Sequence, residues 1–531
     1  MKKNHLPVLE PHILQAVCRG VEKESLRITS NGTLSRKAHP VGLGSALTHP
    51  KITTDFSESQ LELITGTHIS TEGCIHELEE IHQNVYENLE DEFLWCSSMP
   101  CNLPKEELIP IATYGSSNVG TAKTVYRKGL HHRYGSQMQM ISGIHYNFSL
   151  PTTLWESCRE NSQNKDSIEE ISNRYYFGLI RNFQRQSWLL LYLYGASPAV
   201  CADFAKNTTG QLKQLQSGDK YLPFATSLRM GPMGYQSNVQ SSISVSYNSL
   251  ESYTQSLKKA LTDPYPPYAS IGIKNDSDYN QLATSLLQIE NEFYSTIRPK
   301  RPIKPGERAL NALNSRGVEY IEIRAIDLNP FSNVGITAET IRFLDIFLIH
   351  CLVNNSVNDS TKEIVKMNHN QHVVAEYGRD PNIKLANGDN MYSVKDWGLQ
   401  LLDQCSPVAT ALDSSFETTE YTKALENARG AVENPDKTLS ARVLHEIENN
   451  CDGSFNQFTL HKSKSHAKEI DALPYSLTAK RTDSAVAQSS LFKQRELEAE
   501  SCLDFESYRK SYIQQTLYPE KETKKTNSGA K

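Results

Sequence analysis

This sequence of 531 residues lacks an excess of positive charge. Lysine and arginine number 55 against 61 aspartates and glutamates, and the formal net charge at pH 7 is −6. A protein that binds nucleic acid through bulk positive charge has the opposite balance. Hydrophobic residues make up 38% of the chain and charged residues 22%, which is typical of a folded globular protein. We therefore expect a globular protein without a nucleic-acid partner.

Long apolar runs are also missing. The first seven residues, MKKNHLP, do not contain the apolar stretch of a secretory signal peptide. The longest apolar stretch, from Trp188 to Cys201, is interrupted by Gly195 and Pro198. It is shorter than the about 20 residues that span a bilayer. We therefore expect a soluble, cytoplasmic protein with no membrane partner.

The ten cysteines include no C-x-x-C pair. Cys96 and Cys101 are closest in sequence, but no histidine is spaced from them as in a zinc site. Thiols in a protein without an export signal stay reduced, and they often pack as small hydrophobic side chains. We therefore expect reduced, mostly buried cysteines, although the sequence leaves open whether any two of them pair.

Several common enzyme motifs are absent. No G-x-x-x-x-G-K-[ST] sequence occurs, and the glycines at 42–44 lack the third glycine of a dinucleotide-binding turn. His76 and Glu77 are not followed by a histidine at position 80, so we interpret them as a solvated helix face rather than part of a zinc protease. The basic cluster at 298–301 is interpreted as a solvated turn, with a phosphate contact as the alternative.

The pattern of apolar residues predicts three long helices, over 71–95, 171–194 and 341–353. Roughly the last seventy residues are charged and helical in composition. Length alone suggests several domains, but no repeat or low-complexity linker divides the chain. We expect a single domain over 1–515, with a motif-bearing core (about 15–335) and a helical part (about 336–515), followed by a disordered tail over 516–531.

Four short segments alternate polar and apolar residues as β-strands do. Their polar faces carry Glu22 and Glu24 (20–26), Gln60 and Glu62 (60–64), His145, Asn147 and Ser149 (144–150), and Glu322 and Arg324 (320–326). The simplest interpretation is an antiparallel sheet with one wet face. A merely wet face, however, favours threonine, lysine and serine, whereas these faces carry mainly carboxylates. If the strands are neighbours, the carboxylates repel one another unless cations lie among them.

The same segments belong to a longer series of motifs in a fixed order. The series is GVEKESLR (20–27), LGSALTH (43–49), ITTDFSE (52–58), YGSSN (114–118), YRKGL (126–130), SGIHYNFSLP (142–151), YLP through Arg229 (221–229), IRPKR (297–301) and YIEIR (320–324). It resembles the bacterial glutamate–cysteine ligases (γ-glutamylcysteine synthetases). The motifs cover about 15–335, similarity weakens towards about 450, and the remainder matches poorly.

The resemblance implies an α+β fold like that of glutamine synthetase, in which a curved, mainly antiparallel sheet lines the active site and helices pack on its outer face. It implies that ATP converts the γ-carboxylate of L-glutamate to γ-glutamyl phosphate. The amine of L-cysteine then displaces phosphate, which gives γ-glutamylcysteine in the first step of glutathione biosynthesis. Two alternatives stay open: another ATP-dependent glutamate–amine ligase of this fold, and a non-catalytic nucleotide- or metal-binding regulatory homologue. We expect a monomer, and the sequence leaves feedback inhibition by glutathione open.

The resemblance also implies a set of metal ligands: Glu22, Glu24, Asp55, Glu62, His145 and Glu322. Carboxylates suit Mg²⁺, whereas the histidine leaves Mn²⁺ open. Asp55 has a simpler alternative as a turn or cap residue. Arg324 is implied to be catalytic, stabilising the transferring phosphoryl group, with a salt bridge to a carboxylate such as Glu322 as its alternative.

Substrate-binding residues follow from the resemblance as well. Arg229 is implied to bind the α-carboxylate of glutamate. The implied cysteine pocket consists of Phe56, Tyr126, Arg127, Leu130, Tyr235 and Tyr294. For each tyrosine, a place in the core with a satisfied hydroxyl is an equal alternative.

Overall fold

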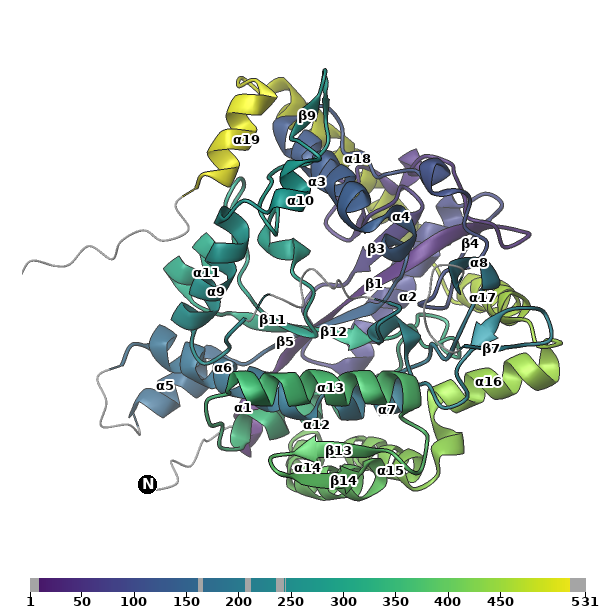
Figure 1. Ribbon diagram of the computed structural model, residues 1–531, viewed down its shortest axis with the longest axis vertical. Coiled ribbons are helices and arrows are strands. Elements are labelled where there is room, and N and C mark those ends of the chain that lie inside the picture. The colour runs from purple at the N-terminus through teal and green to yellow at the C-terminus, as the bar shows by residue number, and fades with distance from the viewer. Residues whose placement is uncertain (1–8, 161–165, 206–211, 235–242, 244, 516–531) are drawn as a thin grey trace, which may run out of the picture.

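The computed structural model describes residues 9–160, 166–205, 212–234, 243 and 245–515 (Figure 1). The expected disordered tail, 516–531, and the proposed pocket residue Tyr235 lie outside the described residues. Within the described ranges, no helix is both long and apolar enough to cross a bilayer.

A seven-stranded antiparallel sheet forms the centre of the molecule. Its strand order is β11-β12-β5-β1-β3-β2, and β4 pairs with the far end of β1. The strands are β1 (Cys18–Thr29), β2 (Ile52–Thr54), β3 (Gln60–Ile64), β4 (Glu92–Leu94), β5 (Ile144–Ser149), β11 (Ile297–Lys300) and β12 (Tyr320–Ile326). The four segments predicted from their alternation are therefore β1, β3, β5 and β12, and they are neighbours in this sheet. The predicted α+β fold with an antiparallel sheet is confirmed.

Helices make up the rest of the main framework. They are α1 (Pro11–Leu14), α2 (Thr71–Asn88), α3 (Asn118–Tyr134), α4 (Ser136–Gln139), α5 (Thr152–Glu160), α6 (Ile168–Gln186), α7 (Trp188–Tyr194), α8 (Ala202–Ala205), α9 (Leu250–Thr262), α10 (Pro266–Ala269), α11 (Ala309–Arg316), α12 (Ala338–Val353), α13 (Thr361–Tyr377), α14 (Val394–Phe416), α15 (Glu420–Glu433), α16 (Leu439–Asn450), α17 (Phe455–Asp471), α18 (Leu477–Ala499) and α19 (Phe505–Ile513). Short strands pair outside the main sheet: β6 (Ala199–Val200), β7 (Lys213–Gln214) and β8 (Lys220–Tyr221), β9 (Lys274–Asn275) and β10 (Asp278–Tyr279), and β13 (Lys384–Asn387) and β14 (Asn390–Ser393). Single 3-10 turns occur at Val41–Leu43 (η2), Glu106–Leu108 (η3), Leu228–Met230 (η4), Glu290–Glu292 (η6) and Pro435–Lys437 (η7).

Two of the three predicted long helices are shorter than expected. The helix predicted over 71–95 ends at Asn88, because residues 92–94 instead form β4 and pair with β1. The helix predicted over 171–194 is interrupted at Ser187, where α6 ends and α7 begins. In both places the apolar spacing continues beyond the break, so the spacing alone could not locate it.

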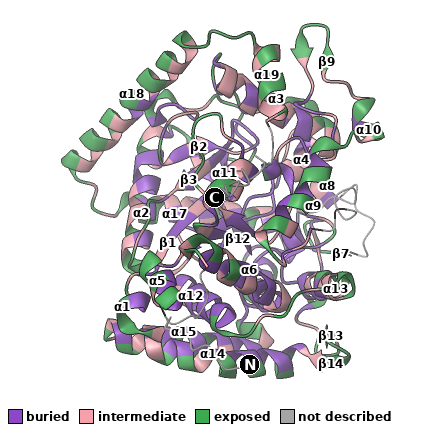
Figure 2. Ribbon diagram, turned by 90° about the vertical axis from the view of Figure 1, so that its left-hand side faces the viewer, coloured by how far each residue is buried: buried purple, intermediate pink, exposed green. Residues whose placement is uncertain are grey.

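The apolar face of the sheet packs against helices. Val21, Phe148 and Ile323 are completely buried in one large core cluster with residues of α6 and α12, including Phe347. Figure 2 shows this buried layer along β12 and α12. Burial of each such side chain contributes about 1.5–3 kcal/mol. The helices therefore cover one face of the sheet and leave the polar face for a site.

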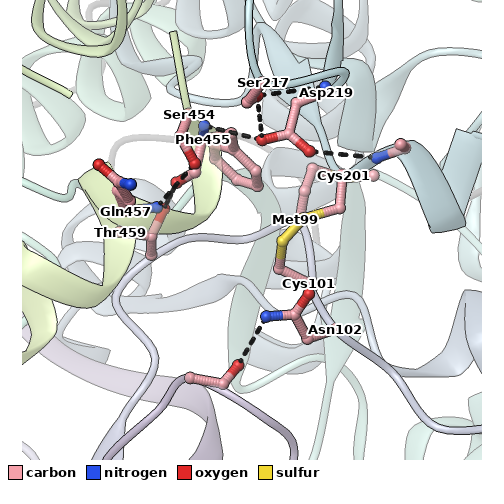
Figure 3. The surroundings of a disulfide bond; sticks show 12 residues. Met99, Cys101, Asn102, Cys201, Ser217, Asp219, Ser454, Phe455, Gln457 and Thr459 are labelled. Atoms are coloured by element: carbon pink, nitrogen blue, oxygen red, sulfur yellow. Dashed lines mark hydrogen bonds between the residues drawn. A yellow bond between two sulfur atoms is a disulfide. The ribbon is translucent and has the colours of Figure 1, made fainter. Parts of the chain in front are cut away.

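Two cysteines depart from the expectation of reduced thiols. Cys101 and Cys201 form a disulfide with their Cα atoms 5.3 Å apart, beside Met99 and Asp219 (Figure 3). The eight other cysteines are free, as expected, and most of them are buried. The pairing joins cysteines 100 residues apart, so no local sequence pattern predicts it.

Two interpretations of charged clusters are also corrected. His76 is exposed, as predicted, but Glu77 is only partly exposed. Its carboxylate accepts a hydrogen bond from the backbone N–H of Gly66 at 2.6 Å and forms an ion pair with Lys51 at 2.6 Å. The basic cluster at 298–301 is not a solvated turn, because its first three residues lie in β11 and Arg298 is buried.

Candidate active site

Strand register brings the polar side chains of four strands onto one surface. Glu24 pairs with Glu62 across β1 and β3, and Glu22 pairs with His145 across β1 and β5. On the other side of β5, Asn147 pairs with Glu322 of β12. Directly paired residues in an antiparallel sheet project their side chains from the same face. The carboxylates predicted separately on each strand are therefore gathered together.

The centre of this surface is a compact cluster of Glu22, Glu62 and His145. One ligand atom from each of these three residues lies within 4.8 Å of those of the other two. His145 Nδ1 is 3.2 Å from Glu22 Oε2, and His145 Nε2 is 3.4 Å from Glu24 Oε1. Carboxylate oxygens and an imidazole nitrogen at this spacing are a donor set that fits a divalent cation.

The electrostatics of the cluster favour such a cation. Burial raises the pKa of Glu62 well above its ordinary value, and the nearby charges of Glu22, Asp55 and Glu24 raise it further. Burial and Asp55 also raise the pKa of Glu24, although His145 opposes them. These carboxylates resist ionisation because they are crowded together and largely shielded from water. A positive ion among them would relieve the repulsion.

Glu322 differs from the other carboxylates because cations surround it. Its Oε1 atom is 3.2 Å from Lys300 Nζ, and its Oε2 atom is 3.4 Å from Arg324 Nη1. Burial acts to raise the pKa of Glu322, but Lys300 and Arg324 outweigh burial and hold this pKa well below its ordinary value. The salt bridge that was the alternative for Arg324 is therefore present. A catalytic role for Arg324 stays a prediction.

Arg229 is buried next to this cluster. Its Nη2 atom donates to the carbonyl of Arg324 at 2.9 Å, and its Nη1 atom lies 3.6 Å from Asp327 Oδ1. A Cβ atom at position 143 would overlap with the Arg229 guanidinium, so a larger residue there would displace this buried side chain. The backbone N–H of Gly143 donates to Glu24 Oε2 at 2.9 Å. Arg229 is thus packed against the backbone that holds one of the clustered glutamates.

Three residues of the predicted cysteine pocket lie in one apolar cluster. Phe56 and Leu130 are buried in it, and Tyr126 packs against it. Tyr294 lies near this group, with its ring 5.9 Å from that of Tyr134 and its hydroxyl accepting a hydrogen bond from Gln139 at 2.9 Å. The structure therefore places Phe56, Tyr126 and Leu130 in one apolar cluster, and it places Tyr294 against Tyr134, which packs on that cluster. Their contacts with a substrate stay a prediction.

The guanidinium of Arg127 already has several partners. It donates to the carbonyl oxygens of Thr54, at 3.3 Å, and of Asp55, and it stacks over the Tyr114 ring at 4.5 Å. These bonds fix the turn after β2, in which Asp55 lies. The alternative of Asp55 as a turn residue therefore has support alongside the predicted metal role.

Neither the sequence patterns nor the resemblance assigned a role at the site to three residues that contact or face the clustered carboxylates. Asn147 Nδ2 donates to Glu22 Oε1 at 2.7 Å and orients that carboxylate. Lys300 contacts Glu322, as described above. On α3, burial and the charge of Arg127 lower the pKa of Lys123 to about 8, whereas Glu62 and Asp55 act to raise it. For Lys300 a signal existed, because the phosphate alternative for the basic cluster at 298–301 pointed to this strand.

The antiparallel sheet, with glutamates and a histidine gathered on one face and arginines beside them, has the fold of the glutamine synthetase-like ligases, as its match to a solved ligase shows. Within that class, the chain belongs to the glutamate–cysteine ligase family, whose family model matches residues 8–374. The chain is therefore a ligase, which uses ATP to drive amide formation. The alternative of a non-catalytic homologue has no support.

Individual relatives agree with this assignment. The chain is 45% identical over 511 residues to glutamate–cysteine ligase of Alcanivorax borkumensis, covering 94% of this chain and 96% of the relative. It is 45% identical over 500 residues to the Pseudomonas putida enzyme, covering 94% and 95%. Among solved structures, it matches glutamate–cysteine ligase of Francisella tularensis in complex with AMP with a TM-score of 0.88 and 36% identity, over 94% of this chain and 97% of that one. A bifunctional glutathione synthetase from Pasteurella multocida matches with a TM-score of 0.69 and 26% identity, over 90% of this chain and 56% of that one.

Proposed function

We propose that the chain joins the γ-carboxylate of L-glutamate to the amine of L-cysteine at the carboxylate cluster on β1, β3, β5 and β12. The cluster of Glu22, Glu62 and His145, with ligand atoms within 4.8 Å of one another, is the observation that carries the proposal. The γ-carboxylate attacks the terminal phosphorus of ATP and releases ADP. The cysteine amine then attacks the resulting acyl phosphate, loses a proton and releases phosphate.

The proposed cation ligands are Glu22, Glu24, Asp55, Glu62, His145 and Glu322. A divalent metal held there would supply positive charge to the phosphate oxygens of the nucleotide. The carboxylates suit Mg²⁺, and His145 leaves Mn²⁺ open. The raised pKa values of Glu24 and Glu62 support this assignment, since crowded carboxylates are ordinarily paired with cations.

The remaining roles follow from charge and polarity. We assign Arg324, which is 8% exposed, to stabilise the transferring phosphoryl group. Arg229 would pair with the α-carboxylate of glutamate. The apolar surface of Phe56, Leu130 and Tyr126 would receive the small side chain of cysteine. We propose that the enzyme is a monomer.

Amine selectivity tests this proposal. We expect cysteine to be the best amine, followed by 2-aminobutyrate, which replaces the thiol with a methyl group. Serine should be poorest, because desolvating its hydroxyl against apolar walls costs about 1–3 kcal/mol. Initial rates of ADP release at subsaturating amine, with glutamate and ATP fixed, provide the measurement. Equal rates with serine and cysteine would contradict the pocket, and amine-independent ADP release would contradict the ligase reaction.

A further inference from the structure

Glu322 is held on both sides by cations. Its Oε1 atom lies 3.2 Å from Lys300 Nζ and its Oε2 atom 3.4 Å from Arg324 Nη1. The side chain of Glu322 is only 1% exposed, so water does not compete for either oxygen. A carboxylate engaged in this way is a poor ligand for a further cation until one of the two partners withdraws.

Of the two cations, Lys300 is the one that can withdraw. Its side chain is 29% exposed, against 10% for Arg324. Lys300 ends β11, which is an edge strand of the sheet. An ammonium group on a flexible four-carbon stem is readily hydrated, whereas a planar guanidinium is not. Arg324 is further confined, because its Nη1 atom is 3.5 Å from His145 Nδ1.

The position of Lys300 keeps it near the site after it leaves Glu322. Lys300 pairs with Tyr320 across β11 and β12, and Arg298 pairs with Glu322 one pleat away. All four residues therefore project from the same face of the sheet. A lysine released from the carboxylate remains beside the place where the proposed site requires phosphate oxygens.

We propose that Lys300 is an exchangeable counter-ion, which neutralises Glu322 in the free enzyme and passes to the phosphate oxygens of ATP when a metal occupies Glu322. The proposal rests on the proposed function, since it takes Glu322 as a metal ligand. Repulsion between the ammonium group and an arriving divalent cation gives the exchange its direction. Lys300 therefore opposes metal binding in the absence of nucleotide and supports nucleotide binding in its presence.

Binding of Mn²⁺ to the free enzyme, measured by electron paramagnetic resonance without nucleotide, tests the first half. Removing the competing charge in Lys300→Met should tighten Mn²⁺ binding at least about tenfold. Lys300→Arg keeps the charge and should bind Mn²⁺ as weakly as the wild type. Arg301→Met is the matched control: it removes one positive charge from the next residue, whose Nε atom pairs instead with Glu319 at 3.2 Å, and it should leave binding within about twofold.

Steady-state kinetics test the second half. In Lys300→Met, KM for ATP should rise at least about tenfold while KM for glutamate changes little, because only the phosphate contact is lost. Melting temperatures accompany both measurements. If Lys300→Met does not fold, Lys300→Gln, which can still donate a hydrogen bond to Glu322, must show the same tighter Mn²⁺ binding.

The outcomes separate this inference from the proposed function. Unchanged Mn²⁺ binding in a folded Lys300→Met, together with a loss of binding in Glu322→Gln, would overturn the counter-ion role and leave the metal site intact. Unchanged binding in Glu322→Gln would instead overturn the assignment of Glu322 as a ligand. If Lys300→Met has a lower melting temperature but unchanged metal binding and unchanged KM for ATP, the ion pair between Lys300 and Glu322 has only a structural role.

Discussion

The guanidinium of Arg324 lies between two residues of the proposed metal site, 3.4 Å from Glu322 Oε2 and 3.5 Å from His145 Nδ1. If it stabilises the transferring phosphoryl group, Arg324→Ala should lower kcat by about two to three orders of magnitude. Arg324→Lys should also be impaired, because it keeps the charge but loses the planar, two-pronged donor. We expect binding of ATP and glutamate to change less than kcat.

The measurements are kcat and melting temperature on the same preparation of Arg324→Lys. A purely structural ion pair gives the opposite pattern, in which the protein melts earlier but turns over normally once folded. Normal turnover in that variant would therefore show that Arg324 has no catalytic role.

At the scale of elements, the two faces of β1 carry side chains of opposite charge. Glu22 and Glu24 face the site, whereas Lys23 points to the other side and is buried against α2. Lys23 Nζ lies 2.6 Å from His82 Nε2, and the other ring nitrogen of His82 is 2.7 Å from the carbonyl of Leu78. That second bond requires a proton on Nδ1, so Nε2 accepts the hydrogen bond from Lys23.

This arrangement predicts an effect of pH on stability. Burial lowers the pKa of Lys23 from 10.5 to about 7 in the folded protein. Between these values the unfolded chain binds more protons than the folded one, so stability rises with pH by up to about 1.4 kcal/mol per unit. Burial likewise lowers the pKa of His82, so it does not supply a compensating charge.

Denaturant unfolding of the wild type and of Lys23→Met at several pH values above 7 measures this effect. The difference in unfolding free energy between the two proteins should change with pH over that range, since the variant has no group to titrate there. Parallel stability profiles would show that Lys23 keeps its proton in the folded state.

The elements also show what the sequence could and could not predict. Alternation is a local property, so the strand faces carrying Glu22, Glu62, His145 and Glu322 were predictable one by one. That these strands are neighbours depends on pairing over long sequence distances, and only the family resemblance supplied it. The contact between Lys300 and Glu322 also joins two strands, so the local sequence of the basic cluster favours the interpretation as a solvated turn.

At the scale of the whole molecule, the last two described helices connect segments that are distant in sequence. Ser490 of α18 accepts a hydrogen bond from the backbone N–H of Ser45 at 2.9 Å, and the carbonyl of Leu503 accepts one from Asn118 at 3.0 Å. Arg509 of α19 donates to the carbonyl of Leu282 at 2.6 Å. Figure 1 shows α18 and α19 beside α3. These contacts support our proposal that residues 1–515 form one domain.

The same contacts predict a specific consequence of removing the helices. Only Ala487 and Ser490 of α18 are buried, so loss of the segment after residue 476 should cost little of the central core. It should, however, release the start of α3, which carries Tyr126 and Leu130 of the proposed cysteine pocket. We expect the truncated chain to fold, with KM for cysteine raised at least about tenfold and KM for glutamate changed much less.

Hydrogen exchange of residues 118–134, together with the two KM values, measures this effect. Protection of α3 should fall in the truncated chain, because its N-terminal hydrogen bonds to the segment after α18 are lost. Phe492→Ser is a suitable control, since Phe492 is 60% exposed on α18 and its replacement should leave both the exchange and the KM values unchanged. If KM for cysteine and KM for glutamate rise equally, the helices support the whole fold rather than the cysteine side of the site. If neither changes, the pocket on α3 is independent of the C-terminal helices.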